Sequence, residues 1–492
     1  MSRLRTTLRR VPPPLALLLG AALVLSVAWS LATAPFQGPD EAEHFAYVEH
    51  LATTGHIPSA VGGRGPYALD EIVGLQQGYS RTLFNPLVRP PWSKLQERSW
   101  QAAEKALPAG ARETGDGPTQ VAKNPPLYYA LATVVDKLTF GSGLFGRLFV
   151  LRLLGAVLLL ATVALTWMAM GELFGPRRTL PRTVATAIVA LLPMDGFISA
   201  VVNTDPLLAV IWTTFLWLSL RVVRLGLTWQ RSATLALVAV LSVLTHGRGL
   251  AILPPLVVVL VLAWLRHHRG VRSTLAAAAG SGVVLAAGFA VYRVVTSAAG
   301  AGGSLYAGEV NLGRSGTFSI RGYLENVWEF YLPRLPFMNG RPGPAIGFRQ
   351  IVAEQYLTGV FGSQEIAFGA WVGRAAQLGF AALVVGGLVA AVVRRDVLAR
   401  GWPKLVVLVV LGGAMLALLH LASYRSLANG TGNPLIVGRY LVPVTPLLGA
   451  GVGGVVALLP RRAAVPLAVV VVVALIALSV GGLGLTLERF YA

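Results

Sequence analysis

Long apolar runs recur along the whole sequence and restrict this chain to folds that cross a membrane. A run of about 18 or more apolar residues can span the hydrocarbon core of a bilayer. The composition agrees, since 55% of the 492 residues are hydrophobic and only 13% are charged. We therefore predict an all-α, polytopic membrane protein with about eleven transmembrane helices. The predicted spans are residues 14–34, 147–173, 183–201, 205–223, 232–246, 249–265, 273–296, 373–393, 404–422, 440–459 and 464–486.

Basic residues lie in the N-terminal segment and in every second connection between these spans. Cytoplasmic loops carry such an excess of arginine and lysine, so these segments are predicted to face the cytoplasm. This placement explains the net charge of +20 without a nucleic-acid partner. The basic residues of the connections are Arg177, Arg178, Arg182, Arg221, Arg224, Arg231, Arg266, Arg269, Arg272, Arg394, Arg395, Arg400, Lys404, Arg461 and Arg462.

The two longest loops fall on the opposite, outer side of the membrane and hold sixteen of the twenty-one acidic residues. Ala32 and Ala34 resemble a signal-peptidase site, but the apolar run before them is long for a signal peptide, which favours an uncleaved first helix. The predicted parts are a basic N-terminus (1–13), a transmembrane module (14–296) that includes the outer loop 35–146, a second outer loop (297–372) and C-terminal transmembrane helices (373–492).

Both outer loops contain candidates for short helices at the membrane surface. We expect a surface helix within residues 90–108 and interfacial helices at 124–138 and 321–337. Tyr128 and Tyr129 are predicted to lie at the level of the lipid headgroups, where aromatic side chains are enriched. The chain has no cysteine, which excludes disulfides, thiol catalysis and cysteine-ligated metals.

Titratable residues crowd the start of the first outer loop, directly after the first predicted span. In one interpretation Asp40 caps a helix and Glu43 completes a capping box. In the other, Asp40, Glu43, His44 and Tyr47 form one polar face of that helix. A carboxylate beside apolar surface and other acids is expected to have a raised pKa, which suits a general base. We therefore predict Asp40 and its neighbour Glu41 as catalytic residues.

Further polar residues lie at the predicted outer ends of later helices, and most have an ordinary structural alternative. Asn203 and Asp205 favour turns, and an arginine such as Arg439 often only reaches toward the headgroups. Arg248 is a cation on the predicted outer side, where the positive-inside pattern expects few. It is either part of a site or an incidental charge in the loop. Asp195 lies within a predicted span and must face protein or water, and its role stays open. The predicted substrate-binding residues are His44, Asn124, Asn203, Asp205, His246, Arg248, Arg439 and Tyr440.

These residue types together suit transfer of a group from a lipid phosphate. A carboxylate can remove the proton of an acceptor hydroxyl, and cations stabilise the charge that grows on a departing phosphate. The sequence contains no nucleotide-binding glycine motif. A site on the outer face also has no access to cytoplasmic nucleotide sugars or ATP.

Four motifs resemble those of the GT-C superfamily of integral membrane glycosyltransferases. They are PDEAEH (39–44), NPPLYY (124–129), VNTD (202–205) and GRYLVPVTPLL (438–448). The resemblance covers roughly residues 14–460. It is greatest to a bacterial family of predicted membrane proteins with a Pro-Asp-Glu-x-x-His signature, and more distant to protein O-mannosyltransferases and aminoarabinose transferases.

The resemblance implies a GT-C-like fold and inverting transfer of a monosaccharide from a polyprenyl-phosphate sugar, with Asp40 as the base. The acceptor is a glycan, glycolipid or protein at the outer face of the bacterial cytoplasmic membrane. Related sequences often have lysine where this chain has His246 and Arg248. Some relatives bind a divalent metal and others do not, and no other cofactor is expected. The alternatives are a non-catalytic envelope assembly protein and a transporter or flippase for a lipid-linked or anionic solute.

Overall fold

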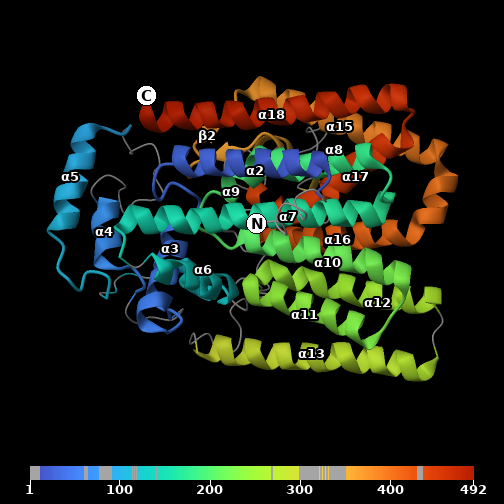
Figure 1. Cartoon of the computed structure of the whole chain (residues 1–492), viewed down its shortest axis with the longest axis horizontal. Coiled ribbons are helices and arrows are strands. Elements are labelled where there is room, and N and C mark those ends of the chain that lie inside the picture. The colour runs from blue at the N-terminus through green and yellow to red at the C-terminus, as the bar shows by residue number, and fades with distance from the viewer. Residues whose placement is uncertain are drawn as a thin grey trace, which may run out of the picture.

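The long helices of the chain lie side by side in one bundle, with a group of short helices at one end (Figure 1). The computed structural model describes residues 11–59, 65–76, 91–113, 115, 117, 119–139, 141–267, 270–298, 321, 324, 327, 328, 331, 351–428 and 436–492. Nine helical segments of this described part are long and apolar enough to cross a membrane. They are α2 (Pro13–Ala32), α7 (Leu144–Phe174), α10 (Asp205–Leu225), η3 with α12 (Gly247–His267), α13 (Val271–Ala298), α15 (Ala370–Val393), α16 (Arg395–Ala428), η5 with α17 (Gly438–Leu458) and α18 (Arg461–Tyr491).

Two shorter apolar helices, α8 (Thr179–Leu191) and α11 (Trp229–Thr245), complete the bundle. Ten predicted spans each overlap one of these helical segments, whereas the span predicted at 183–201 is divided into α8 and α9 (Pro193–Ile198). The predicted helical membrane fold is confirmed. The number of helices that cross the membrane stays a prediction. The described chain departs from an all-α fold at a small antiparallel hairpin, β1 (Val360–Phe361) and β2 (Ile366–Ala367).

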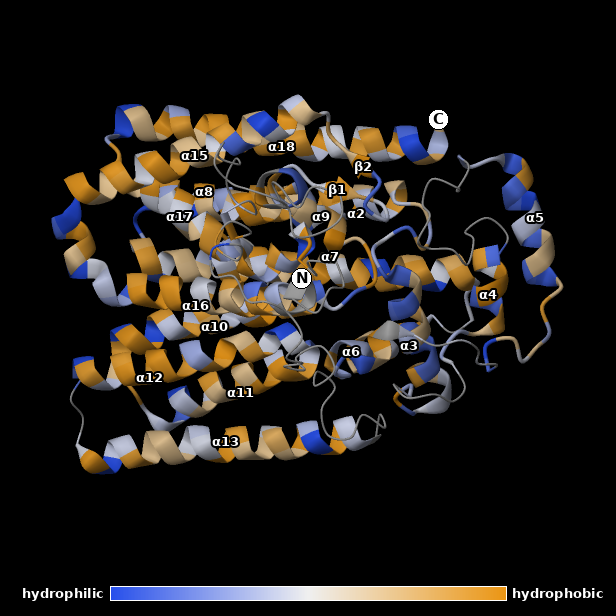
Figure 2. Ribbon diagram, turned by 180° about the vertical axis from the view of Figure 1, so that it is seen from behind, coloured by the Kyte–Doolittle hydropathy of each residue, from blue (hydrophilic) through white to orange (hydrophobic). Residues whose placement is uncertain are grey.

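The basic connections meet at one end of the bundle. Lys404 Nζ donates a hydrogen bond of 2.6 Å to the Glu172 carbonyl, and Arg224 forms an ion pair of 2.9 Å with the Glu172 carboxylate. These contacts bring together the ends of α7, α10 and α16, and Figure 2 shows hydrophilic residues at such helix ends beside apolar helix bodies. These contacts support the prediction that the basic connections lie on the same side of the membrane. That this side is cytoplasmic stays a prediction.

The short helices form a cap at the opposite end. Ser93 Oγ accepts a hydrogen bond from Gln96 N and begins the surface helix predicted within 90–108. Tyr128 and Tyr129 are 1% and 0% exposed, so their predicted headgroup placement is wrong; the Tyr129 ring stacks on Tyr47 at 3.6 Å instead. Most of 321–337 lies outside the described residues. The cap consists of α3 (Glu41–Thr54), α4 (Leu69–Gln76), α5 (Lys94–Lys105), η2 (Gln120–Lys123) and α6 (Leu127–Leu138).

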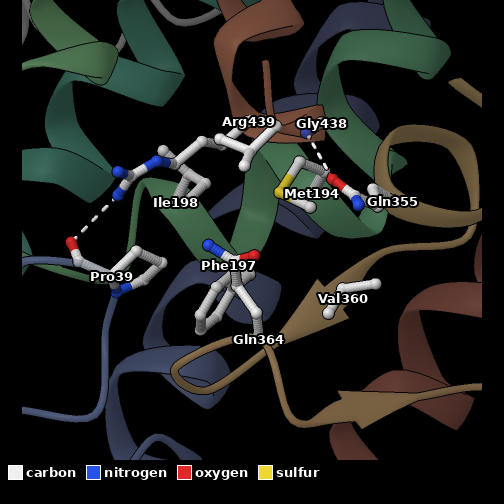
Figure 3. A pocket seen from close by; sticks show the side chains of 10 residues that line it. Pro39, Met194, Phe197, Ile198, Gln355, Val360, Gln364, Gly438 and Arg439 are labelled. Carbon is white, nitrogen blue, oxygen red and sulfur yellow. Dashed lines mark hydrogen bonds between the residues drawn. The ribbon is translucent and has the colours of Figure 1, made fainter. Parts of the chain in front are cut away.

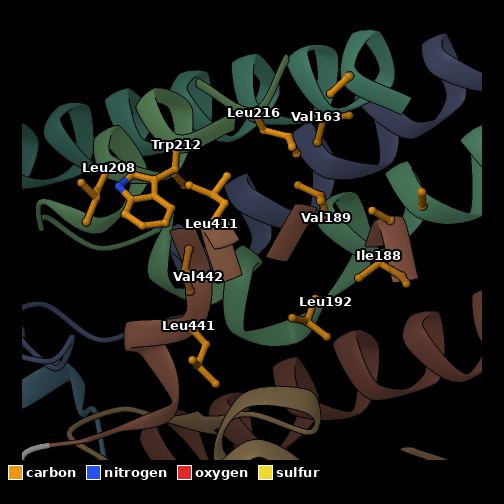
Figure 4. Packing of buried hydrophobic residues seen from close by; sticks show 14 of the residues in the cluster. Val163, Ile188, Val189, Leu192, Leu208, Trp212, Leu216, Leu411, Leu441 and Val442 are labelled. Carbon is orange, nitrogen blue, oxygen red and sulfur yellow. The ribbon is translucent and has the colours of Figure 1, made fainter. Parts of the chain in front are cut away.

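The apolar core fixes the helix that carries Asp205. Leu208, Trp212 and Leu216 of α10 are buried in the same cluster as Leu441 and Val442 (Figure 4). Trp212 Nε1 donates to Ser242 Oγ of α11 at 3.0 Å. Lipid tails are as apolar as these side chains, so close packing rather than removal from water stabilises such a core. α10 is therefore held between α11 and η5 (Gly438–Val444), with its first residue at the cap end.

Candidate active site

A polar cavity of about 160 Å³ lies where the cap meets the bundle. Nine of the ten predicted site residues line it, from segments that are far apart in the sequence. Glu41 does not line it, and Glu43, which was not among the predicted site residues, does. The lining residues are Asp40, Glu43, His44, Val121, Asn124, Asn203, Thr204, Asp205, His246, Arg248, Arg439 and Tyr440.

Asp40 directs its carboxylate into this cavity from the residue before α3. Its φ of 57° is left-handed, a conformation that non-glycine residues seldom adopt and that clusters at functional sites. Asp40 occupies the N-cap position but makes no side-chain capping hydrogen bond, so the capping-box interpretation is wrong. Its carboxylate instead pairs with Arg439. The side chain is 48% exposed, which leaves the carboxylate accessible from the cavity.

Arg439 reaches Asp40 because η5 begins directly against η4 (Ile351–Leu357). A Cβ on Gly438 would lie 2.6 Å from the Gln355 backbone, so only glycine fits there. Arg439 also donates to the Pro39 carbonyl at 3.1 Å. Partial burial is the largest single influence and acts to raise the pKa of Asp40, but the charges of Arg439 and His44 and the hydrogen bond from Arg439 together lower the pKa below its usual value. The expected raised pKa of Asp40 is therefore wrong.

Arg248 supplies a second guanidinium on the same wall. A Cβ on Gly249 would lie 2.0 Å from the Ser242 carbonyl, so glycine allows η3 to fold back against α11. Arg248 pairs with Asp205, and its guanidinium lies 4.2 Å from the Tyr440 ring centroid, a cation–π contact. The cavity therefore holds two acid–arginine pairs side by side.

The loop before α10 sets the position of Asp205. Asn203 Nδ2 donates to the Ile198 and Val201 carbonyls at 2.9 and 3.3 Å, and Asn203 Oδ1 accepts from Asp205 N at 2.8 Å. The turn that the sequence allowed as an alternative is thus present, and it is the means by which the carboxylate reaches Arg248.

Two neutral histidines complete the lining. Burial lowers the pKa of His44 to about 4, and its Nδ1 is bonded to Tyr129 OH at 2.8 Å. Asn124 Nδ2 donates to the same hydroxyl at 3.1 Å. His246 Nδ1 accepts from Arg248 N at 3.1 Å, and burial also lowers the pKa of His246. The neutral His246 ring therefore carries its proton on Nε2, where it can donate to a hydroxyl group.

Glu41 and Glu43 point in different directions although both lie in the first turn of α3. Glu41 is 0% exposed, and its carboxylate accepts from Arg152 at 2.8 and 2.6 Å and from Val202 N at 3.1 Å. It therefore joins α3 to α7 and to the loop before α10 rather than facing the cavity. Glu43 accepts from Thr119 Oγ1 at 3.1 Å at the cavity edge. In the sequence, the spacing of three residues between Asp40 and Glu43 indicated that Glu43 lies on the same helix face.

A smaller pocket lies on the other side of Arg439, beside α9 (Pro193–Ile198) (Figure 3). Its volume of about 10 Å³ has room for about one water molecule. Gln355 and Gln364 bring amide groups to this pocket, and Gln355 Oε1 accepts from Gly438 N at 2.9 Å. These contacts hold the backbone that carries Arg439.

An open apolar groove of about 520 Å³ is lined in part by η3, the element that also carries Arg248. Leu250 and Ala251 of η3 form one side, and Gly413, Ala414 and further residues of α16 form the other. The small α16 residues leave room between the two helices, and the groove lies on the apolar surface of the bundle.

Asp195 is explained by packing inside the bundle. It is 2% exposed and accepts from Thr445 Oγ1 at 3.0 Å, and that hydroxyl is also bonded to Tyr356 OH at 2.7 Å. The prediction that Asp195 faces protein or water is thus confirmed. Within the described residues, no group of three or more His, Cys, Asp or Glu is arranged to hold a metal ion.

The helices are arranged in a GT-C-like membrane fold. The chain is similar to the oligosaccharyltransferase of Archaeoglobus fulgidus tethered to an acceptor peptide with the NVT sequon, with a TM-score of 0.51 and 13% identity over 97% of this chain and 56% of that one. It is also similar to ArnT from Cupriavidus metallidurans bound to undecaprenyl phosphate, with a TM-score of 0.47 and 15% identity over 91% and 60%. At these identities the likeness concerns the fold alone.

The chain belongs to the family described as "Predicted membrane protein (DUF2142)", whose profile matches residues 23–448. A search of curated protein sequences finds no match.

Proposed function

We propose that this protein is a glycosyltransferase that moves a monosaccharide, with inversion, from a polyprenyl-phosphate donor to a glycan, glycolipid or protein of the cell envelope. The observation that carries the proposal is the cavity in which Asp40 meets the guanidinium groups of Arg248 and Arg439. A carboxylate can accept the proton of a nucleophile, and paired guanidiniums suit a phosphate leaving group.

In this mechanism an acceptor hydroxyl attacks the anomeric carbon and its proton passes to Asp40. The bond from that carbon to the phosphate oxygen breaks, and the phosphate keeps the electron pair. Arg248 and Arg439 stabilise the resulting charge. A phosphate that engages Arg439 also weakens its pairing with Asp40, which raises the pKa of Asp40 and makes it a stronger base. His44 and His246 are placed to bond sugar or acceptor hydroxyls.

We assign the reaction to the outer face of the bacterial cytoplasmic membrane. The cavity lies at the cap end of the bundle, away from the basic connections, which the positive-inside rule favours on the cytoplasmic side with the N-terminus. A transporter needs a polar path across the midplane. The core between α8, α10 and η5 is apolar and closely packed instead, which favours a transferase.

Undecaprenyl phosphate should stabilise the purified protein against thermal unfolding, and Arg439→Ala should weaken its binding by roughly ten- to a hundredfold. The reason is the loss of a charge-assisted hydrogen bond, which contributes about 1.5–3 kcal/mol. The measurement is a lipid titration followed by native mass spectrometry, with undecaprenol as the uncharged control ligand. Unchanged affinity in Arg439→Ala would refute the phosphate assignment.

The lipid chain is expected to lie in the groove between η3 and α16. Ala414→Trp fills this groove and should weaken undecaprenyl phosphate binding, because the isoprenoid chain loses its contacts there. Inorganic phosphate should bind as before. Ala382→Trp places the same side chain on the exposed surface of α15 and serves as the matched control. Equal lipid affinity in the two variants would remove the groove from the donor site.

A further inference from the structure

A second group of charged side chains lies inside the cap, away from the cavity. The Glu49 carboxylate of α3 accepts from Arg112 at 2.7 Å and from Arg147 of α7 at 2.8 Å. Arg147 also pairs with Asp70 of α4 at 2.6 Å, and Arg112 lies 3.4 Å from Asp136 of α6. One network of ion pairs therefore joins four helices of the protein.

Acids outnumber cations in this network, which we call the cap charge cluster. Glu71 of α4 adds a fourth carboxylate; it is 0% exposed, and neither of its side-chain oxygens has a hydrogen-bond partner among the residues that the structure describes. Four ionised carboxylates and two guanidiniums carry a net charge of −2, which is costly to bury. The cluster consists of Glu49, Asp70, Glu71, Arg112, Asp136 and Arg147.

We propose that the cap charge cluster binds two protons, one on Glu71 and one on Asp136, and that their release at higher pH loosens α3. This helix carries Glu43 and His44 of the cavity and follows Asp40 directly. The cluster would therefore couple proton concentration to the position of the proposed catalytic groups.

The surroundings of both acids favour the protonated form. Burial and the charges of Glu49 and Asp70 raise the pKa of Glu71, against the opposing charge of Arg147. Burial and the neighbouring Glu49 carboxylate raise the pKa of Asp136 to about 7, although Arg112 and Arg147 act in the opposite direction. The helix α5 packs against α4 and contributes a further acid, Glu104, whose carboxylate accepts a hydrogen bond from Leu144 N.

The sign of the pH effect follows from the raised pKa values. An unfolded aspartate has a pKa of about 3.9, so the folded protein holds protons that the unfolded chain has already released. The stability contributed by these protons is full below the unfolded pKa and is lost as the pH rises through the folded pKa. For Asp136 this loss extends up to its folded pKa of about 7 and levels off roughly one pH unit above it.

Thermal unfolding of the purified protein in detergent, measured from pH 5 to 9, tests the proposal. The midpoint of the wild type should fall by several degrees as the pH rises, with faster hydrogen exchange in residues 41–54 at high pH. Glu71→Gln and Asp136→Asn mimic the protonated side chains, so each should reduce the fall and the double variant should remove most of it. Asp396→Asn, at an exposed position on α16, is the matched control and should keep the wild-type profile.

A wild-type midpoint that does not change with pH would overturn the proposal, as would a wild-type slope in the double variant. Added CaCl₂ or MgCl₂ separates protons from a bound cation. If either salt restores the wild type at pH 8 but has no effect on Glu71→Gln, the cluster holds a divalent cation and the proton proposal is wrong. None of these outcomes depends on undecaprenyl phosphate binding, so failure here leaves the proposed function standing.

Discussion

Asp40→Asn is expected to lower the rate of sugar transfer by about 10²–10⁴-fold, the usual contribution of a general base. The amide cannot take up the acceptor proton. Undecaprenyl phosphate should bind at least as tightly as to the wild type, because Arg439 loses the carboxylate that competes with the phosphate. The measurement is the release of polyprenyl phosphate from a panel of hexosyl and pentosyl polyprenyl-phosphate donors, together with lipid binding by the same preparations.

The combination of lost transfer and retained lipid binding distinguishes the possible roles of Asp40. A variant that transfers sugar at the wild-type rate would favour the non-catalytic assembly protein. Loss of lipid binding along with transfer would mean that Asp40 only positions Arg439. Asp396→Asn makes the same chemical change at an exposed position on α16, and it should affect neither measurement.

Most residues that line the cavity could be selected from the sequence because polar and charged side chains gather at the predicted outer helix ends. Arg248 is a cation on the predicted outer side, and Asp205 and Arg439 stand at helix starts beside a membrane edge. Their partners were not predictable. Arg439 and Asp40 are 399 positions apart in the sequence, and their contact depends on the packing of η5 against α9 and α10.

The roles of neighbouring acids on α3 show where the sequence pattern fails. Asp40 precedes α3 with a left-handed backbone, whereas Glu41 is the first residue of the helix, so the two side chains face different surroundings although they are adjacent. The pattern placed Glu43 on the face of Asp40 and His44, but it also allowed the alternative of a capping box. The pKa of Asp40 depends on Arg439, which no local pattern contains.

Glu41→Gln is expected to lower the free energy of unfolding by about 3–5 kcal/mol, the usual cost of breaking a buried ion pair from one side. Arg152 is 3% exposed and donates to the Ser30, Thr33 and Ala34 carbonyls at 2.9, 2.7 and 3.1 Å. It cannot move to water without releasing the end of α2. The measurement is denaturation of the purified protein in mixed micelles, followed by tryptophan fluorescence.

Adjacent residues should therefore give opposite results: Asp40→Asn loses turnover and stays folded, whereas Glu41→Gln loses stability. The exposed pair of Asp396 and Arg400 is the control, since such pairs contribute about 0.3–0.5 kcal/mol. The double variant Glu41→Leu with Arg152→Met should not restore stability, because three carbonyls of the α2 end and Val202 N lose their partners. Full recovery in the double variant would mean that the charge of Arg152 alone, and not its hydrogen bonds, makes the single variant unstable. A Glu41→Gln protein of wild-type stability but without turnover would instead return Glu41 to the catalytic residues.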